Sequence, residues 1–343
     1  MKGALKFGIA GYGMIAEIHA KCIEELQGAQ LVAVYGQKRN KAEAFAEKYG
    51  AQVYTNYEEM LSEEDIDVVC ILTPSGTHAK FGIPAAAAGK HIIVEKPIDV
   101  TLENADQLLE VCRSSNVRLC GISQHRYDPA IVELKKAVEL NMLGQLNLGI
   151  SRTTWYRSNE YYASNSWRGT WALDGGGALI NQSIHYVDLL QYIMGPIEEV
   201  FSYCVNRAHE DIEVEDIAVA TVKFKNGAVG LIEGNTAAYP GFSAKLEIYG
   251  SDGSVVIEND HVQEWKLKNG YQYEPPQIDK SHNVGAADAR NISHESHKKQ
   301  IGDFLKDIRE DKEPLVNGEE ARKALEFLLA IYESARTGRP VKI

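Results

Sequence analysis

Short apolar runs alternate with amphipathic segments through the first third of the chain. Short runs that are mainly apolar are typical of strands buried on both faces. They fall at residues 7–10, 31–35, 67–72, 91–94 and 117–121. Helical periodicity predicts helices at residues 14–26, 41–49, 77–88 and 101–114. This alternation of strand and helix predicts an α/β fold, with a doubly wound parallel sheet over residues 1–122.

The pattern changes after residue 122. Hydrophobic and polar residues alternate over residues 146–154, and Asn226-Gly227 predicts a hairpin turn further along. The later strands are expected at residues 200–205, 217–224, 228–235, 244–249 and 254–257, and helices at residues 134–140, 178–194, 298–309 and 319–335. Residues 123–343 are therefore predicted to form a second domain, of α+β type, built on a mostly antiparallel sheet.

Length and charge narrow the functional classes. A chain of 343 residues is long enough for two domains. Its 36 Lys and Arg against 48 Asp and Glu give a net charge of −12, which argues against a nucleic-acid or anionic-membrane partner. No apolar run reaches the roughly 18 residues of a membrane span, and no signal-peptide core precedes the first strand. We therefore expect a cytoplasmic protein.

The cysteines and histidines form no familiar metal or disulfide pattern. The five cysteines are scattered without C-x-x-C spacing, so we expect most of them to be small buried hydrophobic residues. His282, His294 and His297 lie near one another in the sequence, but their spacing fits no common set of ligands. We therefore expect no metal site.

A glycine-rich turn follows the first predicted strand. Gly11, Gly13 and Ala16 stand in G-x-G-x-x-A order before a helix. Gly11 permits a backbone shape that a side chain would block, and Gly13 lets a pyrophosphate approach the main chain. Free N–H groups at the helix N-terminus favour phosphate. The turn predicts a dinucleotide site, with a plain turn as the alternative.

The end of the second predicted strand bears on the choice of coenzyme. A carboxylate normally stands near this point and binds the ribose 2′-hydroxyl of NAD. Here Gly36 and Gln37 are followed by Lys38 and Arg39, and no acid is present. Cations without a carboxylate suit a 2′-phosphate, so we favour NADP over NAD. The alternative is that these cations belong to a solvated helix start.

Two further positions carry acid–base side chains where a ligand is expected. Lys96 follows a predicted strand, and open α/β sheets bind ligands at such strand ends. A lysine confined there is able to exchange a proton with a substrate hydroxyl. Asn181 and His185 lie four residues apart on a predicted helix and so share a face. The alternatives are a surface lysine and a structural histidine.

Four motifs stand in order along the chain. They are Gly11-Tyr12-Gly13-Met14-Ile15-Ala16, Thr73-Pro74-Ser75-Gly76-Thr77-His78, Glu95-Lys96-Pro97, and the segment from Gly175 to His185. Together they resemble the motifs of the Gfo/Idh/MocA oxidoreductases, and the segment from Ile331 to Arg339 is similar as well. The resemblance therefore covers nearly the whole chain.

The resemblance implies a Rossmann domain and a C-terminal domain with a large open sheet. It also implies hydride transfer between NAD(P) and a secondary alcohol or ketone of a sugar, sugar acid, nucleotide sugar or polyol. By analogy, Lys96 and His185 carry catalysis. The family often has an aspartate where this chain has Asn181, and an amide cannot act as a base, so proton transfer is expected at Lys96 or His185. Family members that have the Asn181-Gln182 pair and Trp167-Arg168-Gly169 before the glycines look like dehydrogenases of nucleotide sugars and related hexoses, and Arg168 is able to hold a phosphate or a carboxylate.

These considerations give a set of expected site residues. The cofactor contacts are expected to be Gly11, Gly13, Met14, Ile15, Gln37, Lys38, Arg39, Thr73, Pro74, Ser75, His78, Glu95, Lys96 and Gln124. The substrate contacts are expected to be Lys96, Tyr156, Arg168, Asn181 and His185. Tyr156, Tyr161 and Tyr162 either stack on or hydrogen-bond a sugar, or line a contact between subunits.

Two other functions fit the same motifs. Some relatives use bound NAD in a redox-assisted glycoside hydrolysis, and a cofactor-bound sensor would keep the fold without turnover. Retention of Lys96 and His185 argues against the sensor. By analogy we also expect a homo-oligomer, a dimer or a tetramer, in which subunits meet through the large sheet.

Overall fold

The computed structural model describes residues 3–63, 65–274 and 293–343, and the chain divides into two compact units. The first unit comprises residues 1–124 and 294–325, and the second comprises residues 125–293 and 326–343. Residues 294–325 thus belong to the first unit, although the division expected at residue 122 does not assign them to it. His282, considered above for metal binding, lies outside the described residues. No helix in the described ranges is long and apolar enough to cross a membrane.

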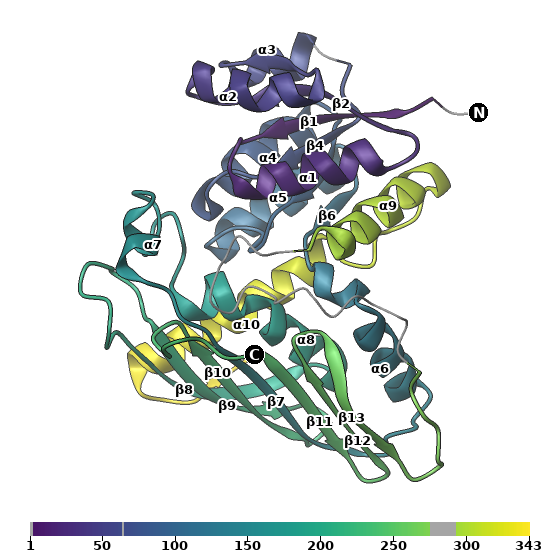
Figure 1. Cartoon of the computed structure of the whole chain (residues 1–343), viewed down its shortest axis with the longest axis vertical. Helices are drawn as coiled ribbons and strands as arrows, with labels where there is room; N and C mark the ends of the chain where they lie inside the picture. Colours follow the sequence, from purple (N-terminus) through teal and green to yellow (C-terminus); the bar gives the residue numbers. More distant parts are fainter. Residues whose placement is uncertain (1–2, 64, 275–292) are drawn as a thin grey trace. The chain divides into compact units, whose positions relative to one another are not determined.

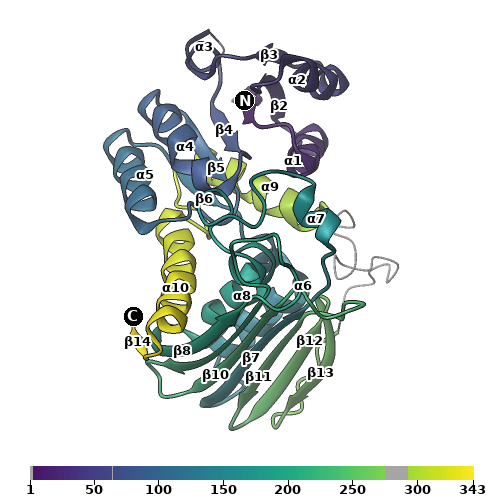
Figure 2. The same ribbon diagram turned by 90° about the vertical axis from the view of Figure 1, so that its left-hand side faces the viewer.

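Six parallel strands form the sheet of the first unit, in the order β3-β2-β1-β4-β5-β6 (Figures 1 and 2). The strand order reverses at β1, and doubly wound sheets bind ligands at such a switch point. The strands are β1 (Leu5–Ala10), β2 (Ala29–Tyr35), β3 (Gln52–Tyr54), β4 (Val68–Ile71), β5 (His91–Val94) and β6 (Leu119–Gly121). The predicted doubly wound parallel sheet is confirmed. The hydrophobic pattern did not predict β3, because this strand is too short to show a recognisable apolar run.

Helices cover both faces of this sheet: α1 packs with α9 on one face, and α4 packs with α5 on the other (Figure 2). Phe7 and Ile9 of β1, Ile23 of α1 and Phe304 of α9 are buried together, which holds α9 against the sheet. Thr101 caps α5, because its Oγ1 accepts the Asn104 N–H at 3.2 Å. The helical segments are α1 (Met14–Glu25), α2 (Arg39–Ala46), η1 (Glu47–Tyr49), α3 (Tyr57–Glu63), η2 (Ser75–Thr77), α4 (His78–Ala87), α5 (Leu102–Ser114), η3 (Gln124–Tyr127) and α9 (Glu295–Glu310), and α10 (Gly318–Thr337) begins in this unit.

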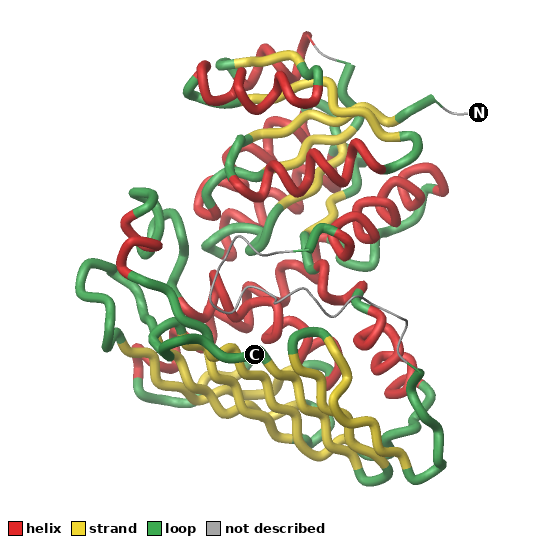
Figure 3. Tube along the Cα trace, viewed as in Figure 1, coloured by secondary structure: helices red, strands yellow, loops and turns green. Residues whose placement is uncertain are grey.

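The second unit is built on a large sheet, whose strands are yellow in Figure 3. It has eight strands in the order β13-β12-β11-β7-β10-β9-β8-β14. Strands β7 and β10 pair in parallel, and the other neighbouring strands of this sheet pair antiparallel. The strands are β7 (Leu146–Thr154), β8 (Ile197–Val205), β9 (Ile217–Phe224), β10 (Val229–Asn235), β11 (Lys245–Gly250), β12 (Gly253–Glu258), β13 (His261–Leu267) and β14 (Val341–Lys342). The predicted mostly antiparallel sheet is confirmed, and β13 and β14 are strands that the pattern missed.

Helices of the second unit lie on one face of its sheet, where α8 (Ile184–Met194) packs on β7 and α6 (Pro129–Glu139) packs beside α8 (Figures 1 and 2). A short helix, α7 (Asn159–Ala163), interrupts the loop after β7. Along β9, buried and exposed side chains alternate, so this strand has one face in the core and one face in solvent.

The cysteines lie where small hydrophobic residues are expected. Four are buried and Cys204 is partly buried, and all five are free thiols. Burial raises the pKa of Cys22 and Cys112 to about 12, so these thiols stay neutral.

Candidate functional site

The predicted cofactor residues follow the carboxyl ends of the strands in the first unit. Gly11 follows β1, Gln37 lies just beyond β2, and Thr73, Lys96 and Gln124 lie just beyond β4, β5 and β6. The carboxyl ends of parallel strands meet at one edge of a sheet. The structure therefore brings these residues, which are far apart in the sequence, to one edge.

The glycine turn has the shape that a pyrophosphate requires. Gly11 has a φ of +117°, and a Cβ at this position would lie 2.6 Å from the carbonyl oxygen of Leu72. Gly13 is the N-cap of α1, it has no side-chain cap, and a Cβ there would meet nothing within 4 Å. The first N–H groups of α1 are thus without a side-chain cap, and the main chain is open to approach. These residues fit the pyrophosphate of NAD(P).

Tyr12 occupies the space beside Gly36, where the second strand ends. A Cβ on Gly36 would collide with the Tyr12 ring, so no acidic side chain fits there while Tyr12 keeps this position. Lys38 is the N-cap of α2 and Arg39 is its first residue. The Arg39 guanidinium lies 3.3 Å from the carboxylate of Glu43, in an exposed pair. Cations rather than carboxylates therefore follow this strand directly.

The ring of His78 joins two of the predicted cofactor loops. It is buried, with Nδ1 2.7 Å from the carbonyl oxygen of Pro97 and Nε2 2.9 Å from that of Thr73. Burial lowers the pKa of His78. Ser75 is also buried. His78 thus ties the loop after β4 to the segment that follows Lys96.

Lys96 is preceded by a buried carboxylate. The Lys96 N–H donates to Glu95 Oε2 at 3.1 Å, and Glu95 Oε1 lies 3.0 Å from His19 Nε2 and 3.7 Å from His297 Nε2. Burial alone would raise the pKa of Glu95, but the hydrogen bonds and charge of the two histidines hold it well below its usual range. Glu95, predicted as a cofactor contact, therefore directs its carboxylate to groups of the protein.

The segment that carries Asn181 and His185 begins as a π-helix, η4 (Ala178–Ser183), and continues as α8. The expectation of one α-helix over residues 178–194 is corrected for its first six residues. Ser183 supports the wider turn, since its hydroxyl donates to the carbonyl of Ala178, five residues earlier, at 2.7 Å. Short π segments are frequent at functional sites.

A carboxylate from elsewhere in the chain accepts N–H groups at the start of this segment. Glu215 accepts the N–H groups of Gly177 at 3.0 Å and Leu179 at 2.8 Å, and the hydroxyl of Tyr332 at 3.0 Å. Burial raises the pKa of Glu215 to about 7. The helix is thus capped by a distant side chain rather than by a residue of its own first turn.

Two predicted substrate residues, Arg168 and Asn181, are linked through Tyr161 and Gln182. Arg168 Nη1 donates to this oxygen at 2.5 Å, and Gln182 Nε2 donates to it at 2.9 Å. Gln182 Nε2 also lies 2.6 Å from Asn181 Oδ1, and the Asn181 amide donates to Asp174. The structure therefore joins Arg168 and Asn181 in one network with Tyr161, which was considered above as a sugar contact, and with Gln182 and Asp174, which were not predicted.

Two guanidinium groups flank the same tyrosine ring. Arg168 lies 4.3 Å from the ring centroid of Tyr161 and 4.7 Å from that of Trp167. Arg157 lies 5.5 Å from the Tyr161 centroid and 5.0 Å from that of Trp155. Burial lowers the pKa of Arg157. Arg157 was not predicted, although an arginine among aromatic residues after a strand is the kind of pattern that would have indicated it.

Tyr156 lies beside this region. Its ring packs edge-to-face on Tyr239, at 5.3 Å between centroids, and its carbonyl oxygen accepts a hydrogen bond from Arg157 Nη1 at 2.8 Å. Tyr239 is 78% exposed, so the Tyr156–Tyr239 pair lies at the surface of the unit.

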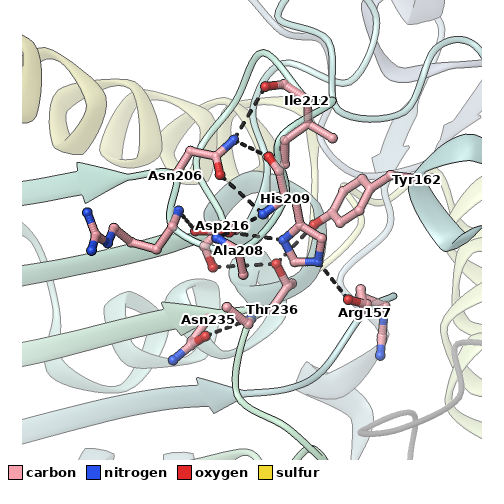
Figure 4. Close-up of polar contacts among 11 residues, drawn as sticks. Arg157, Tyr162, Asn206, Ala208, His209, Ile212, Asp216, Asn235 and Thr236 are labelled. Carbon is pink, nitrogen blue, oxygen red and sulfur yellow. Dashed lines mark hydrogen bonds and ion pairs between the residues drawn. The ribbon is translucent and has the colours of Figure 1, made fainter. Parts of the chain in front are cut away.

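His209 and Asp216 hold the main chain at Arg157 (Figure 4). His209 Nδ1 lies 3.0 Å from Asp216 Oδ2, and Nε2 lies 2.7 Å from the carbonyl oxygen of Arg157. The ring of Tyr162 packs against His209 at 4.8 Å, and its hydroxyl bonds to that of Thr236. Tyr162, considered above as a sugar contact, is buried, and its ring and hydroxyl contact His209 and Thr236.

The ring of His185 packs edge-to-face on that of His125, with 5.0 Å between centroids. His125 Nδ1 lies 2.7 Å from Asp128 Oδ2 and 3.2 Å from Asp260 Oδ1. Burial alone would lower the pKa of His125, but the charges of the two aspartates raise it well above its usual value. An imidazolium therefore lies beside His185. The sequence did not indicate His125.

Known proteins are similar to this chain over almost its whole length. The model described as "Oxidoreductase family, NAD-binding Rossmann fold" (GFO_IDH_MocA) matches residues 5–122, and that described as "Oxidoreductase family, C-terminal alpha/beta domain" matches residues 135–343. The WlbA dehydrogenase of Bordetella pertussis, solved in complex with NADH and UDP-GlcNAcA, is 31% identical, covers 99% of both chains and has a TM-score of 0.87. Myo-inositol 2-dehydrogenase of Thermotoga maritima is 26% identical over 99% of this chain and 98% of its own. The scyllo-inositol 2-dehydrogenase (NAD(+)) of Bacillus subtilis is 27% identical over 100% and 97%.

Proposed function

The chain belongs to the Gfo/Idh/MocA oxidoreductase family, and from that premise we propose that its substrate is a sugar bearing a carboxylate or a phosphate. The protein is an NAD(P)-dependent oxidoreductase that acts on a CH–OH group of a sugar or polyol. The proposal narrows this class to sugar acids and nucleotide sugars.

The observation that carries the proposal is the environment of the Arg168 guanidinium. Within the described parts of the chain it makes no ion pair with a carboxylate, and its Nε is buried without a hydrogen-bond partner. Its neighbours are the hydroxyl and ring of Tyr161 and the ring of Trp167. A guanidinium binds carboxylate or phosphate through two parallel hydrogen bonds, so an anionic ligand would satisfy this group best.

Arg157 adds a second positive charge on the same tyrosine ring. Two cations that repel one another are stabilised together when an anion binds between or beside them. The WlbA dehydrogenase supports the same substrate class, because its complex contains UDP-GlcNAcA, which carries phosphate groups.

Proton transfer is proposed for Lys96 and His185. The bound nicotinamide supplies the hydride acceptor or donor. Lys96, whose main chain is held by Glu95, is the group proposed to take the proton from the reacting hydroxyl or to return it to the carbonyl. His185 is proposed as the second acid–base group, with its ring held against His125. Asn181 is an amide and is proposed only to orient the sugar.

NADP is proposed over NAD as the preferred coenzyme. The space where a carboxylate would bind the ribose hydroxyls is closed by the Tyr12 ring beside Gly36, and Lys38 and Arg39 follow. Cations at this point support the proposal, because they suit a 2′-phosphate.

The test is a screen of neutral sugars, polyols, sugar acids and nucleotide sugars with NAD and NADP in parallel. Turnover is measured by the absorbance of the reduced nicotinamide. Arg168→Met should raise KM for the anionic substrate at least about tenfold, the equivalent of roughly 1.4 kcal/mol. Arg336→Met is the matched control, because Arg336 is exposed and pairs with Glu333 on α10. Equal kcat/KM for neutral and anionic sugars would contradict the proposed substrate class. Release of sugar with no net change in coenzyme absorbance would indicate the redox-assisted hydrolysis instead.

A homo-oligomer that meets through the open sheet face is also proposed. Tyr203, Val219, Val229 and Leu231 are each between 42% and 63% exposed on β8, β9 and β10. Tyr203 is registered opposite Val219, so these two apolar side chains are adjacent on one face. Sedimentation should give a species larger than 38.0 kDa at micromolar concentration, and a monomer alone would contradict the proposal.

A further inference from the structure

Three buried side chains converge beside Lys96. Glu95 follows β5, His19 lies on α1 and His297 lies on α9, and their exposed fractions are 6%, 0% and 2%. Oxygen Oε1 of Glu95 lies 3.0 Å from His19 Nε2 and 3.7 Å from His297 Nε2. Segments from three distant parts of the chain therefore meet on one carboxylate.

The ionised carboxylate determines which ring nitrogen of His19 carries hydrogen. An ionised carboxylate only accepts hydrogen bonds, so the Nε2 atom of His19 must carry hydrogen to bond with it. The opposite ring nitrogen, His19 Nδ1, is buried without a partner among the described residues. A histidine that binds metal almost always donates its other N–H to an acceptor. This geometry therefore favours a hydrogen-bonded carboxylate over a metal site, although the three groups lie close enough to suggest one.

The second oxygen of the carboxylate acts on Lys96 directly. Glu95 Oε2 accepts the main-chain N–H of Lys96 at 3.1 Å, and the Glu95 N–H in turn donates to the carbonyl of Ile71 at 3.1 Å. His19 lies on α1, the helix that begins immediately after Gly13. The cluster thus fixes the main chain from which the Lys96 side chain departs, relative to the helix at the phosphate-binding turn.

We propose that Glu95, held by His19 and His297, is a positioning residue that fixes Lys96 for proton transfer. The inference rests on the proposed function, in which Lys96 exchanges the proton. Glu95 acts through Lys96 and does not itself touch the substrate. Small displacements of a catalytic group cost large factors in rate, so the effect of losing Glu95 should appear in kcat.

The experiment is a double-mutant cycle in the full-length protein. Lys96→Met is measured first, and an unchanged kcat there would contradict the proposed role of Lys96, independently of Glu95. Given a loss in Lys96→Met, Glu95→Gln alone should lower kcat about tenfold or more, with the sugar KM and the coenzyme Kd within about threefold. Because Glu95 acts through Lys96, adding Glu95→Gln to Lys96→Met should cost little further activity. Additive losses, or an unchanged kcat in Glu95→Gln, would overturn the inference.

Variants of His297 separate positioning from folding. Glutamine keeps an N–H donor near the place of Nε2, whereas leucine does not. His297→Gln should therefore retain most of kcat, and His297→Leu should lose about tenfold. His294→Gln is the matched control, because His294 is on the same segment and pairs with Glu25 instead. If both variants lose kcat equally, and in proportion to their loss of Tm, the inference is overturned. One equivalent of bound zinc that disappears in Glu95→Gln would also overturn it.

Discussion

Replacing Asp216 by asparagine should loosen the loop that carries Arg157. Asp216 is fully buried and accepts hydrogen bonds through both oxygens (Figure 4). Oδ1 accepts the Arg207 N–H at 2.9 Å. Oδ2 accepts the N–H groups of Ala208 at 2.7 Å and His209 at 3.2 Å, and lies 3.0 Å from His209 Nδ1. Every donor around this carboxylate therefore points at one of two acceptor oxygens. Asparagine has only one acceptor oxygen, because an NH₂ group replaces the other.

The expected size of the effect follows from this count of donors. The asparagine NH₂ group must face at least one N–H, and a buried donor left unsatisfied costs about 1–3 kcal/mol. The remaining hydrogen bonds lose their charge, which adds roughly 1–2 kcal/mol. We expect the free energy of unfolding of the second unit to fall by about 3 kcal/mol. For a unit of this size, that corresponds to a fall in Tm of roughly 6–12 °C.

Urea unfolding followed by tryptophan fluorescence measures this change. Asp211→Asn is the matched control, because Asp211 is exposed in the same loop, and it should change the free energy of unfolding by less than about 0.5 kcal/mol. The sugar KM should rise more than kcat falls, since His209 would no longer anchor the Arg157 carbonyl. A destabilisation below about 1 kcal/mol in Asp216→Asn would refute the reasoning.

Three further predictions follow from the same structure. Lys96→Met should lower kcat by about 10²-fold or more while the coenzyme Kd, measured by nicotinamide fluorescence, stays nearly unchanged. The pKa of Glu215 rises from 4.5 to about 7 on folding, so the native chain binds more protons than the unfolded chain between these values. Stability should therefore fall by roughly 3 kcal/mol as the pH rises through this window, and Glu215→Gln should flatten that slope in urea titrations. Lys38→Ala combined with Arg39→Ala should raise KM for NADP about tenfold and leave KM for NAD within about twofold, and a parallel change in both would contradict a 2′-phosphate contact.

Local signals explain what the sequence could predict. The apolar run His91–Val94 and the alternating run Ile217–Phe224 form strands with the predicted bounds. Thr101 caps α5 because a capping residue acts on the N–H groups just ahead of it. The glycine turn was recognisable because a strand, a turn and a helix follow one another directly. In each case the residues that decide the structure are neighbours in the chain.

What could not be predicted depends on residues far apart. The π-helix at residues 178–183 is capped by Glu215, which lies 36 and 38 positions from the residues it caps. His19 meets Glu95 across 76 positions. No local pattern states which distant donor will reach a carboxylate. The parallel pairing of β7 with β10 is likewise a property of the assembled sheet. The members of the Arg168 network were therefore only partly identified.

Glu95, Asp216 and Glu215 share one arrangement. Each is buried, and each accepts main-chain N–H groups from the segment beside it, namely that of Lys96, the loop around His209, and the glycine turn before Asn181. Buried charges rarely add stability compared with well-packed apolar side chains of similar volume. We infer that these carboxylates specify a single main-chain position for the functional segment next to them. Substituting any of them leaves the functional side chains chemically intact and displaces them. The variants should then show a fall in kcat or a rise in KM that is larger than their loss of stability explains. A loss of stability alone would assign the three carboxylates to folding.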